Sequence, residues 1–383
     1  GCSKLSDIEF PSTIEEMYGS FRNTFYACPY ATNLITQAQA EGSDGFIYLN
    51  ETILAAYYGS EETVKIKEGT VTIADKAFLY STNVKHIICP ESLRYVGVRA
   101  HFATEATFPS TLESIELNEG LEVIGASAFN GVSNLTDITI PDSVKYVGWW
   151  AFNNTGWLNN QPDGPVYAGK VLYTYKGTMP ANTTLVLEPD TAAIADNALQ
   201  NQSNLVGIDI PDSVTSVNSN LAQSFYNCKN LTDIKIGNGI KEISYQMFKS
   251  CSNLKNITIG NGVKKIGYEA FSGCSNLDKV TVADINSYLN IDFETQNSNG
   301  IYDYTSCPMY YASKLYENNK RVISIDISNK ITEIPPYAFN GCDSIKTIYI
   351  PDSVKKINCN AFENCTNLSA VNIPSNTESI DTS

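Results

Sequence analysis

The sequence has very little histidine and none of the short motifs that accompany catalysis. Only two histidines, His86 and His101, occur in 383 residues. A Ser-His-Asp or Cys-His site needs a histidine with an orienting carboxylate, and nothing near either histidine supplies such a set. The chain also lacks a P-loop, a dinucleotide-binding glycine fingerprint, an H-E-x-x-H pair and an EF-hand loop. We therefore expect no enzyme activity, no metal and no cofactor.

Basic charge and long apolar runs are also scarce. The chain carries 26 basic against 41 acidic residues, a net charge of −15, and such a surface repels phosphate backbones and anionic lipid headgroups. This argues against a nucleic-acid partner. No apolar run approaches the roughly 18 residues of a membrane-spanning helix, so no transmembrane segment is predicted. The chain has no initial Met and no signal peptide, and its first residues already fit the repeat, so we expect it to be a fragment of a longer chain.

What the chain does contain is a repeat of about 23 residues. The segment LTDIKIGNGIKEISYQMFKSCSN begins at Leu231, and LKNITIGNGVKKIGYEAFSGCSN follows it at Leu254. Apolar residues recur at repeat positions 1, 4, 6, 10 and 13, and an aromatic residue recurs at position 18. The same frame extends along nearly the whole chain, which is typical of a stacked repeat protein. Irregular coils interrupt it near residues 28–60, 157–181 and 283–321, and each contains apolar runs around a short polar turn, which predicts a hairpin.

The repeat predicts a solenoid that is mainly β. Positions 4 and 6 alternate with polar residues, as in Ile138-Thr139-Ile140, which is typical of a strand with one buried face. Positions 10 to 13 predict a second short strand in each coil, and the stretch around Ala-Phe predicts a short helical or 3-10 turn. One coil cannot bury its own apolar side, so the coils must stack. We therefore expect residues 1–383 to form a single repeat solenoid, with a parallel strand ladder and the aromatic residues inside.

The motif LTDITIPDSVKYVGWWAF, together with NITIGNGVKKIGYEAFSGCSNL, resembles the BspA-type leucine-rich repeats of bacterial surface proteins. The resemblance covers the chain from Leu5 to Ile380 and implies a leucine-rich-repeat superhelix. It also implies a surface-displayed or secreted bacterial protein, an adhesin or interaction module in an extracellular setting, without catalytic residues. The chain departs from the pattern in one coil, where His101 occupies the aromatic position and five extra residues follow.

Ten cysteines are too few for a disulfide scaffold in a chain of this length. Six share one slot, three residues before repeat position 1: Cys2, Cys228, Cys251, Cys274, Cys342 and Cys365. Their Cβ atoms would point the same way into the core, which predicts reduced, buried thiols. Cys89 fits an inward strand position. The sequence leaves open whether Cys28, Cys307 or Cys359 form disulfides.

The outward positions of the first strand are one candidate binding surface. Repeat positions 3 and 5 vary from coil to coil, while the inward positions stay aliphatic. A constant scaffold with variable outward residues is how a repeat protein builds a recognition surface. The candidate binding residues on this face are Asp233, Lys235, Asp326 and Tyr349.

Aromatic residues around the second irregular coil are the other candidate. They are Trp149, Trp157, Tyr167, Tyr173 and Tyr175. Trp149 is expected at the surface, because its slot holds polar or small residues in neighbouring repeats. Exposed Trp and Tyr contribute strongly to protein interfaces and stack on sugars. The alternative is that these rings pack the irregular coil against the solenoid, and the sequence leaves both open.

Three functions are compatible with these features. The first is a binding or adhesion module whose partner is a host or matrix protein. The second is a structural spacer for another domain. The third is glycan binding, or an unrecognised hydrolase, at the aromatic irregular coils. A binder should show clustered charged or aromatic residues on one face, a spacer should be uniformly polar, and a glycan site should be a concave aromatic slot near Trp149 or Trp157. The sequence does not indicate the oligomeric state.

Overall fold

Most turns of the chain contribute two short strands, and the strands of successive turns pair in parallel as two ladders. A computed structural model describes residues 4–11, 13–14, 21–25, 28–97, 106–217, 223–297 and 299–381. Cys2 and His101 lie outside the described residues. The described part is a β-solenoid of about 14 turns with about 23 residues per turn and little helix, which confirms the predicted fold class. It divides into two compact units, Gly1–Lys176 and Gly177–Ser383.

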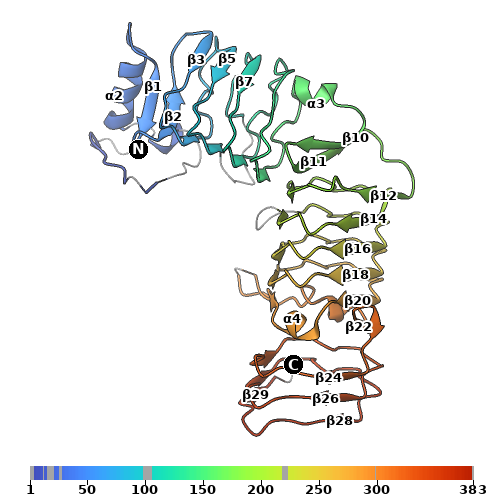
Figure 1. Ribbon diagram of the computed structural model, residues 1–383. Helices are drawn as coiled ribbons and strands as arrows, with labels where there is room; N and C mark the ends of the chain where they lie inside the picture. Colours follow the sequence, from blue (N-terminus) through green and yellow to red (C-terminus); the bar gives the residue numbers. More distant parts are fainter. Residues whose placement is uncertain are drawn as a thin grey trace. The chain divides into compact units, whose positions relative to one another are not determined.

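In the first unit the first ladder consists of β3 (Thr63–Lys65), β5 (His86–Ile88) and β7 (Ser114–Glu116). The second ladder consists of β1 (Phe46–Leu49), β2 (Ile53–Tyr57), β4 (Thr72–Ile73), β6 (Tyr95–Val96), β8 (Val123–Ile124) and β9 (Tyr146–Val147). The remaining elements are α1 (Phe21–Thr24), α2 (Pro29–Ala38), α3 (Gly156–Asn160), β10 (Gly164–Ala168) and β11 (Val171–Lys176). Helix α2 packs beside β1 through a buried cluster that includes Ala31, Ala38 and Ile47 (Figure 1). The helix thereby covers the end of the second ladder, where an open strand edge would invite pairing with another chain.

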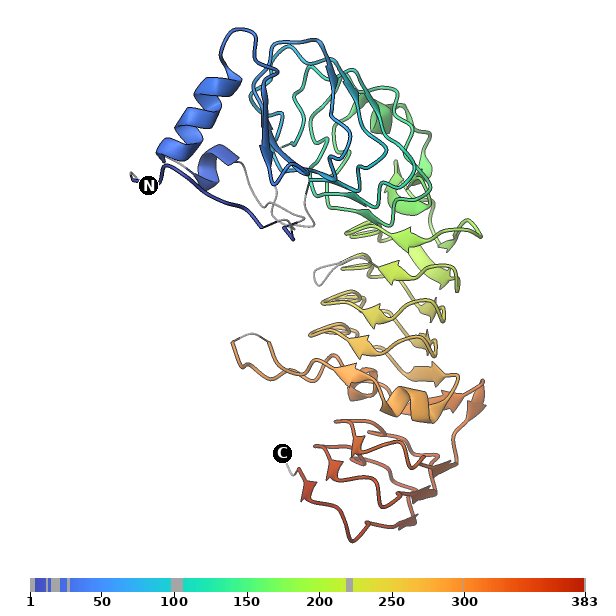
Figure 2. The same cartoon turned by 60° about the vertical axis from the view of Figure 1, so that its left-hand side comes forward.

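In the second unit the first ladder runs through β12 (Thr183–Val186), β14 (Leu205–Ile210), β16 (Asp233–Ile236), β18 (Asn256–Ile259), β20 (Lys279–Val282), β22 (Lys314–Glu317) and β23 (Lys320–Arg321). It resumes with β24 (Ser324–Asp326), β26 (Thr347–Tyr349) and β28 (Ala370–Val371). The second ladder contains β13 (Ala193–Ile194), β15 (Ser216–Val217), β17 (Glu242–Ile243), β19 (Lys265–Ile266), β21 (Asp292–Phe293), β25 (Glu333–Ile334), β27 (Lys356–Ile357) and β29 (Ser379–Ile380). Two short helices complete the unit, α4 (Ile285–Leu289) and the 3-10 helix η1 (Pro308–Tyr310). Figure 2 shows the turns of this unit one above another. Within the described ranges, no helix has the length and apolar character that crossing a bilayer requires.

Each of the three irregular coils contains the predicted hairpin. The antiparallel pairs are β1 with β2, β10 with β11, and β22 with β23. Their tips use residues in the left-handed region, such as Asn318 at φ 47° and Asn319 at φ 62°, which match the right-handed twist of the flanking strands. The hairpins do not all join the same ladder. Strand β2 pairs with β4 on the second ladder, whereas β22 pairs with β20 on the first.

Equivalent apolar residues of successive turns stack on one another inside the solenoid. Ile234 is in register with Ile257, which is in register with Val280 and then Leu315, and all four are buried. A single turn would leave these side chains in water, so the neighbouring turn provides the burial that stabilises each one. The inward alternation predicted for the first strand is therefore confirmed.

The predicted aromatic stack also forms, with one correction. The ring centroids of Phe225 and Phe248 lie 5.4 Å apart, and those of Phe248 and Phe271 lie 5.6 Å apart, both nearly parallel. In the first unit Phe108, and not the position of His101, continues the stack between Phe78 and Phe129, at 5.6 and 4.8 Å. The extra residues of that coil therefore precede the aromatic position instead of following it.

The chain before most of the stacked aromatics forms hydrogen-bonded turns where a short helix was expected. The residue two positions before the aromatic lies in the left-handed region, as at Ser127 (φ 56°), Trp150 (φ 58°) and Glu269 (φ 57°). A left-handed residue interrupts a right-handed helix. Its recurrence redirects the chain at the same place in each turn and brings the following Phe into the core.

Phe271→Ala should lower the free energy of unfolding by about 3–5 kcal/mol, because it leaves a cavity between neighbouring stacked side chains. Urea or thermal denaturation followed by circular dichroism would measure the loss. The matched control is Tyr349→Ala, which removes an exposed ring and should change stability by less than about 1 kcal/mol. Equal effects of the two substitutions would contradict the burial of the stack.

Candidate binding surfaces

The outward face of the first ladder in the second unit carries mostly polar residues whose size and charge change from strand to strand. One column runs Thr184, Gly207, Asp233, Asn256, Lys279, and the next runs Val186, Asp209, Lys235, Thr258. Asp233 and Lys235 are both exposed, as the sequence predicted. Lys235 forms an ion pair with Asp209 at 3.4 Å, and Asp233 accepts a hydrogen bond from the Asn256 side chain at 2.6 Å. Exposed ion pairs of this kind add little stability, so this face is free to vary without unfolding the protein.

A shallow depression lies on this face where Gly207 has no side chain. Its rim includes Thr184, Asp209, Asp233 and Lys235, and its volume is about 410 Å³. A Cβ atom at Gly207 would make only ordinary contacts, the nearest to Thr184 at 3.4 Å. The backbone therefore does not require glycine here, and the missing side chain leaves room for a group from another molecule. The exposed Val186 (81% of its surface) lies one strand away.

The other two ladder residues chosen from the sequence lie together on a separate sheet. Asp326 on β24 is directly opposite Tyr349 on β26, and both side chains are exposed. The hydroxyl groups of Ser324 and Thr347 are hydrogen-bonded at 2.7 Å on the same face. The four ladder candidates thus form two pairs on two sheets of the second unit, and the hairpin β22–β23 is the last part of the first of these sheets.

Two of the five aromatic candidates are core residues. Trp157 is 8% exposed and packs on Phe152, with ring centroids 4.7 Å apart. Tyr173 is buried, and its phenol oxygen accepts a hydrogen bond from the Phe152 N–H at 3.1 Å. Burial raises the pKa of the Tyr173 phenol well above its usual value, so the ring remains neutral. These rings anchor α3 and the β10–β11 hairpin, and the packing interpretation is correct for both.

The exposed tryptophan is Trp150 and not Trp149. Trp150 is 43% exposed, whereas Trp149 is half-buried, and the two ring centroids lie 4.3 Å apart. Trp150 occupies the left-handed position that the buried Ser127 occupies one turn earlier, so the exposure of Trp150 is particular to this turn. Tyr167 and Tyr175 are half-buried. Because they are buried, Trp157 and Tyr173 cannot offer their faces to a glycan, and of the five aromatic candidates Trp149, Tyr167 and Tyr175 remain partly exposed.

The cysteines of the described residues are free thiols, and all but Cys365 are buried. Cys251 donates to the carbonyl oxygen of Phe225 at 3.1 Å and Cys274 to that of Phe248 at 3.2 Å. The shared slot therefore links each turn to the one before it. Burial raises the pKa of Cys228 and of Cys274 to about 12. A protonated, buried thiol is a poor nucleophile, so these groups are structural; Cys28, Cys307 and Cys359 are free as well.

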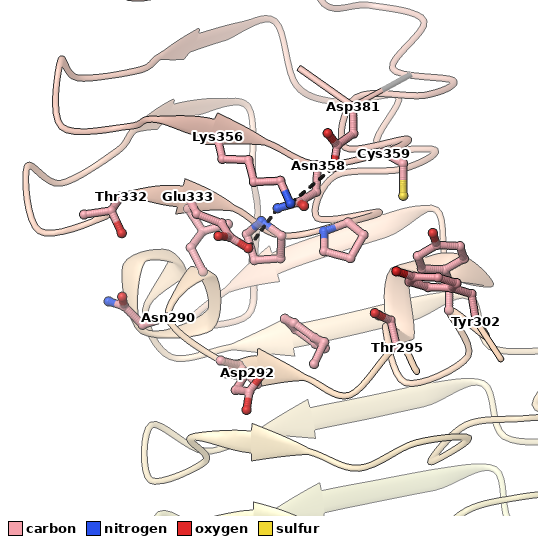
Figure 3. A pocket seen from close by; sticks show the side chains of 16 residues that line it. Asn290, Asp292, Thr295, Tyr302, Thr332, Glu333, Lys356, Asn358, Cys359 and Asp381 are labelled. Atoms are coloured by element: carbon pink, nitrogen blue, oxygen red, sulfur yellow. Dashed lines mark hydrogen bonds and ion pairs between the residues drawn. The ribbon is translucent and has the colours of Figure 1, made fainter. Parts of the chain in front are cut away.

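A cleft that sequence reasoning missed lies between β21 and the strands β25 and β27. Its volume is about 580 Å³. Figure 3 shows Asp292 on one side and Glu333, Lys356 and Asp381 on the other. Lys356 forms an ion pair with Asp381 at 3.3 Å, and Asn358 donates to Glu333 at 2.9 Å. The signal in the sequence was the long interval in the repeat frame, which showed that a coil was irregular without showing which strand it omits.

Neither of the two histidines in the sequence is among the residues of the ladder face or of the cleft lining. His86 lies on β5 in the first unit, where it is hydrogen-bonded to the Ser114 hydroxyl at 2.8 Å. Across the described ranges, no three His, Cys, Asp or Glu side chains converge in a way that could hold a metal ion. What both surfaces offer is shape, charge and strand edges, which are the means of binding.

The BspA type leucine-rich repeat region is the family whose model matches this chain. It matches in six copies, over residues 55–161, 173–298 and 310–383. Most of the chain is therefore covered, including both units. No curated protein matches the sequence.

Solved structures of similar repeat proteins come from bacteria. A leucine-rich cell surface protein of Faecalibacterium prausnitzii is 22% identical, covering 88% of this chain and 92% of its own, with a TM-score of 0.30. A leucine-rich repeat protein of Bacteroides ovatus is 20% identical, covering 86% and 85%, with a TM-score of 0.30. The pneumococcal vaccine antigen PcpA is 19% identical, covering 80% and 79%, with a TM-score of 0.36.

Trp157→Ala should lower the free energy of unfolding by about 3–5 kcal/mol, because the ring is enclosed by the core of the first unit. Trp150→Ala should change it by less than about 1 kcal/mol. Thermal denaturation of both variants beside the wild type would measure the difference. A destabilising Trp150→Ala together with a neutral Trp157→Ala would reverse these assignments.

The buried thiols should make the protein less stable in alkali. An unfolded thiol titrates near the ordinary pKa of 9.0, while Cys274 in the fold titrates at about 12. The stability due to the neutral buried thiol is complete below pH 9 and is lost as the pH rises toward 12. Cys274→Ala should therefore reduce the fall in unfolding free energy between pH 8 and pH 10 by about 1 kcal/mol, measured by urea denaturation at both pH values. Cys365→Ala, at a less buried thiol, is the control and should reduce the fall by less; an identical pH dependence in wild type and Cys274→Ala would contradict the burial.

Proposed function

This chain belongs to the BspA-type leucine-rich repeat family, and on that premise we propose that it is a protein-binding module that engages its partner through the outward face of β14, β16 and β18. We propose further that it acts outside the bacterial cell, displayed on the surface or secreted, as the family resemblance implies. The partner class is a host or matrix protein.

The observation that carries the proposal is the contrast between the two faces of one sheet. The inward residues in register on β14 to β20 are Ile208, Ile234, Ile257 and Val280, all buried. The outward residues opposite one another are Gly207, Asp233, Asn256 and Lys279. Packing alone would not require four different outward residues at equivalent positions. A surface that varies over a constant core is suited to a specific partner, whereas a spacer needs only uniform polarity.

The face carries a defined pattern of acidic and basic residues. Asp209 and Asp233 are acidic, and Lys235 lies one strand from Asp209 and two residues from Asp233. Charges at the rim of an interface chiefly affect the rate of association and the choice of partner. The depression at Gly207 would hold a side chain of the partner among these charges. We propose no catalytic role for the chain.

The test uses a double substitution that exchanges the two charged residues and so keeps an ion pair at the same place. In D209K/K235D the two charges exchange places, so the pair remains but the outward pattern is reversed. Gly207→Gln fills the depression without backbone strain. We expect each variant to weaken binding by about tenfold or more, which corresponds to about 1.4 kcal/mol, in surface plasmon resonance against immobilised extracellular matrix proteins that bind the wild type.

The matched control is E122K/K145E in the first unit, which exchanges another exposed pair at 3.4 Å and should leave binding unchanged. Equal affinity of the wild type, D209K/K235D and Gly207→Gln would place the binding surface elsewhere. A loss of binding in the control as well would show that general charge, and not this face, directs binding.

A further inference from the structure

The second ladder of the second unit is interrupted between β21 and β25. On the first ladder, β22 and β23 follow β20 before β24 begins. On the second ladder β21 ends one sheet and β25 begins another, and no strand of the described residues lies between them. The turn that starts with β22 folds back as a hairpin, so it supplies the first ladder alone. One strand of the second ladder is therefore missing, and the cleft occupies its place (Figure 3).

The edge of β21 presents acceptors to this space. In the intact ladder the carbonyl oxygens of Lys241 and Ile243 each accept a hydrogen bond from the next turn at 2.7 Å. By the register of β17, β19 and β21, the equivalent carbonyl groups on β21 belong to Ile291 and Phe293. The turn that follows β21 does not provide their donors, because it has no strand here. An unpaired strand edge is a template for an extended peptide.

The edge of β25 presents the N–H groups of Thr332 and Glu333, the equivalents of Lys264 and Lys265, and one proline. In β19 and the residue after it, Lys265 and Gly267 donate to the preceding turn at 3.2 and 2.7 Å. The equivalent residues of the β25 turn are Glu333 and Pro335. Pro335 has no N–H, so a donor that would point into the empty space is absent, as is usual at protected edges. The Glu333 N–H remains on the free edge and can pair with an incoming strand.

The charges around the cleft lack a cation at its centre. In the intact part of the ladder Lys265 lies between two acids of neighbouring turns, 3.7 Å from Glu242 and 2.5 Å from Glu294. At the interruption the flanking outward residues are Asp292 and Glu333, both acidic and both exposed. The lysines opposite them in register, Lys265 and Lys356, lie on the strands away from the interruption. They form ion pairs there with Glu294 and Asp381, so no cation of the described residues is placed between Asp292 and Glu333. The missing strand would thus be expected to carry a basic outward residue.

The floor of the cleft accepts an apolar side chain. The lining of the cleft includes the apolar residues Leu289, Ile291, Phe293 and Pro335 beside the polar ones, and these four residues are called the floor. The strands on either side place a charged residue outward and an aliphatic residue inward, as Lys265-Ile266 and Lys356-Ile357 do. The cleft volume of about 580 Å³ lies within the range of ordinary ligand sites.

We propose that this cleft binds an extended segment of a partner protein, which adds a strand in parallel between β21 and β25. The segment carries Lys or Arg followed by an aliphatic residue. The basic side chain lies between Asp292 and Glu333, the aliphatic side chain lies on the apolar floor, and the backbone pairs with Ile291, Phe293 and Glu333. This site is distinct from the ladder face around Gly207 and does not depend on binding there.

The probe is a labelled peptide, acetyl-GVKKIGY-amide, which has the sequence of residues 262–268 and therefore the pattern of an intact second strand. We expect saturable binding to the full chain by fluorescence anisotropy, with a dissociation constant below about 1 mM. The peptide acetyl-GVEEIGY-amide should bind at least tenfold more weakly. Replacing the second glycine by sarcosine removes the N–H that would pair with Phe293 and should also weaken binding. Equal binding of the three peptides, or none by the first, would overturn the proposal.

The variant D292K/E333K tests the site from the other side. It should lose the lysine peptide and gain the glutamate peptide, a reversal that loss of fold cannot produce. The control D352K/E378K makes the same change of net charge at exposed residues outside the cleft and should bind as the wild type does. Unchanged preference in D292K/E333K would refute the assignment.

The occupant is also tested by the size of the protein in solution. Analytical sedimentation over a range of concentrations measures whether the chain dimerises. If the wild type dimerises and D292K/E333K does not, a second copy of the chain fills the cleft and the assignment to a partner protein is overturned. Wild-type chain that stays monomeric while binding the lysine peptide supports it. These results do not depend on the proposed ladder-face function. If D209K/K235D and Gly207→Gln leave binding of a matrix protein unchanged, the peptide results at the cleft still stand.

Discussion

Every part of this structure depends on the burial of one turn by the next. A turn of about 23 residues has too few apolar side chains to enclose a core of its own, so it is stable only between neighbours. Three kinds of contact join adjacent turns in this way. They are the stacked aliphatic side chains of Ile234, Ile257 and Val280, the ring contact of Phe248 with Phe271, and the hydrogen bond of the Cys251 thiol to the preceding turn. Because each links equivalent positions of adjacent turns, a residue that fits one turn fits the next, and the sequence repeats.

The same requirement explains why an irregular turn changes the surface only where it fails to cover its neighbours. An irregular coil must still cover the turns on both sides, and the β22–β23 hairpin does so on the first ladder. On the second ladder this turn supplies no strand, and Leu289 at the end of α4 borders the gap. Helix α4 is held by the Ile285 N–H, which donates to the Glu317 carboxylate, and by the Asn286 side-chain oxygen, which accepts from the Ser328 N–H. The gap is the cleft. The hairpin of residues 46–57 instead joins the second ladder through β2, so a similar sequence pattern has a different outcome there.

Periodicity was enough to predict the fold, since inward positions 4 and 6 and the aromatic position are set by stacking alone. Periodicity did not predict the structure where the interval between repeats departs from 23 residues. Phe108 could replace the position of His101 because an insertion can come before or after an aromatic residue without altering the frame that follows. Trp157 and Tyr173 are buried because α3 and the β10–β11 hairpin bring them against Phe152, a contact that no repeat position encodes. The exposure of Asp233, Lys235, Asp326 and Tyr349 followed from alternation and was predicted correctly, whereas the cleft depends on which ladder a hairpin joins, and that choice has no local signature.

The two surfaces of the second unit differ in how they can evolve. Outward residues on the intact ladder make few stabilising contacts, and exposed pairs such as Lys235 with Asp209 contribute little. They can change one at a time without cost to the core, which gives a face of adjustable specificity. The cleft is bounded instead by backbone groups of β21 and β25 and by Pro335, whose position is set by stacking. Its preference for an extended segment is therefore a property of the interruption itself, and only the charge at Asp292 and Glu333 is free to select among such segments. A chain built from one repeated turn thus obtains variation from its exposed side chains and a defined binding shape from the turn that is missing a strand.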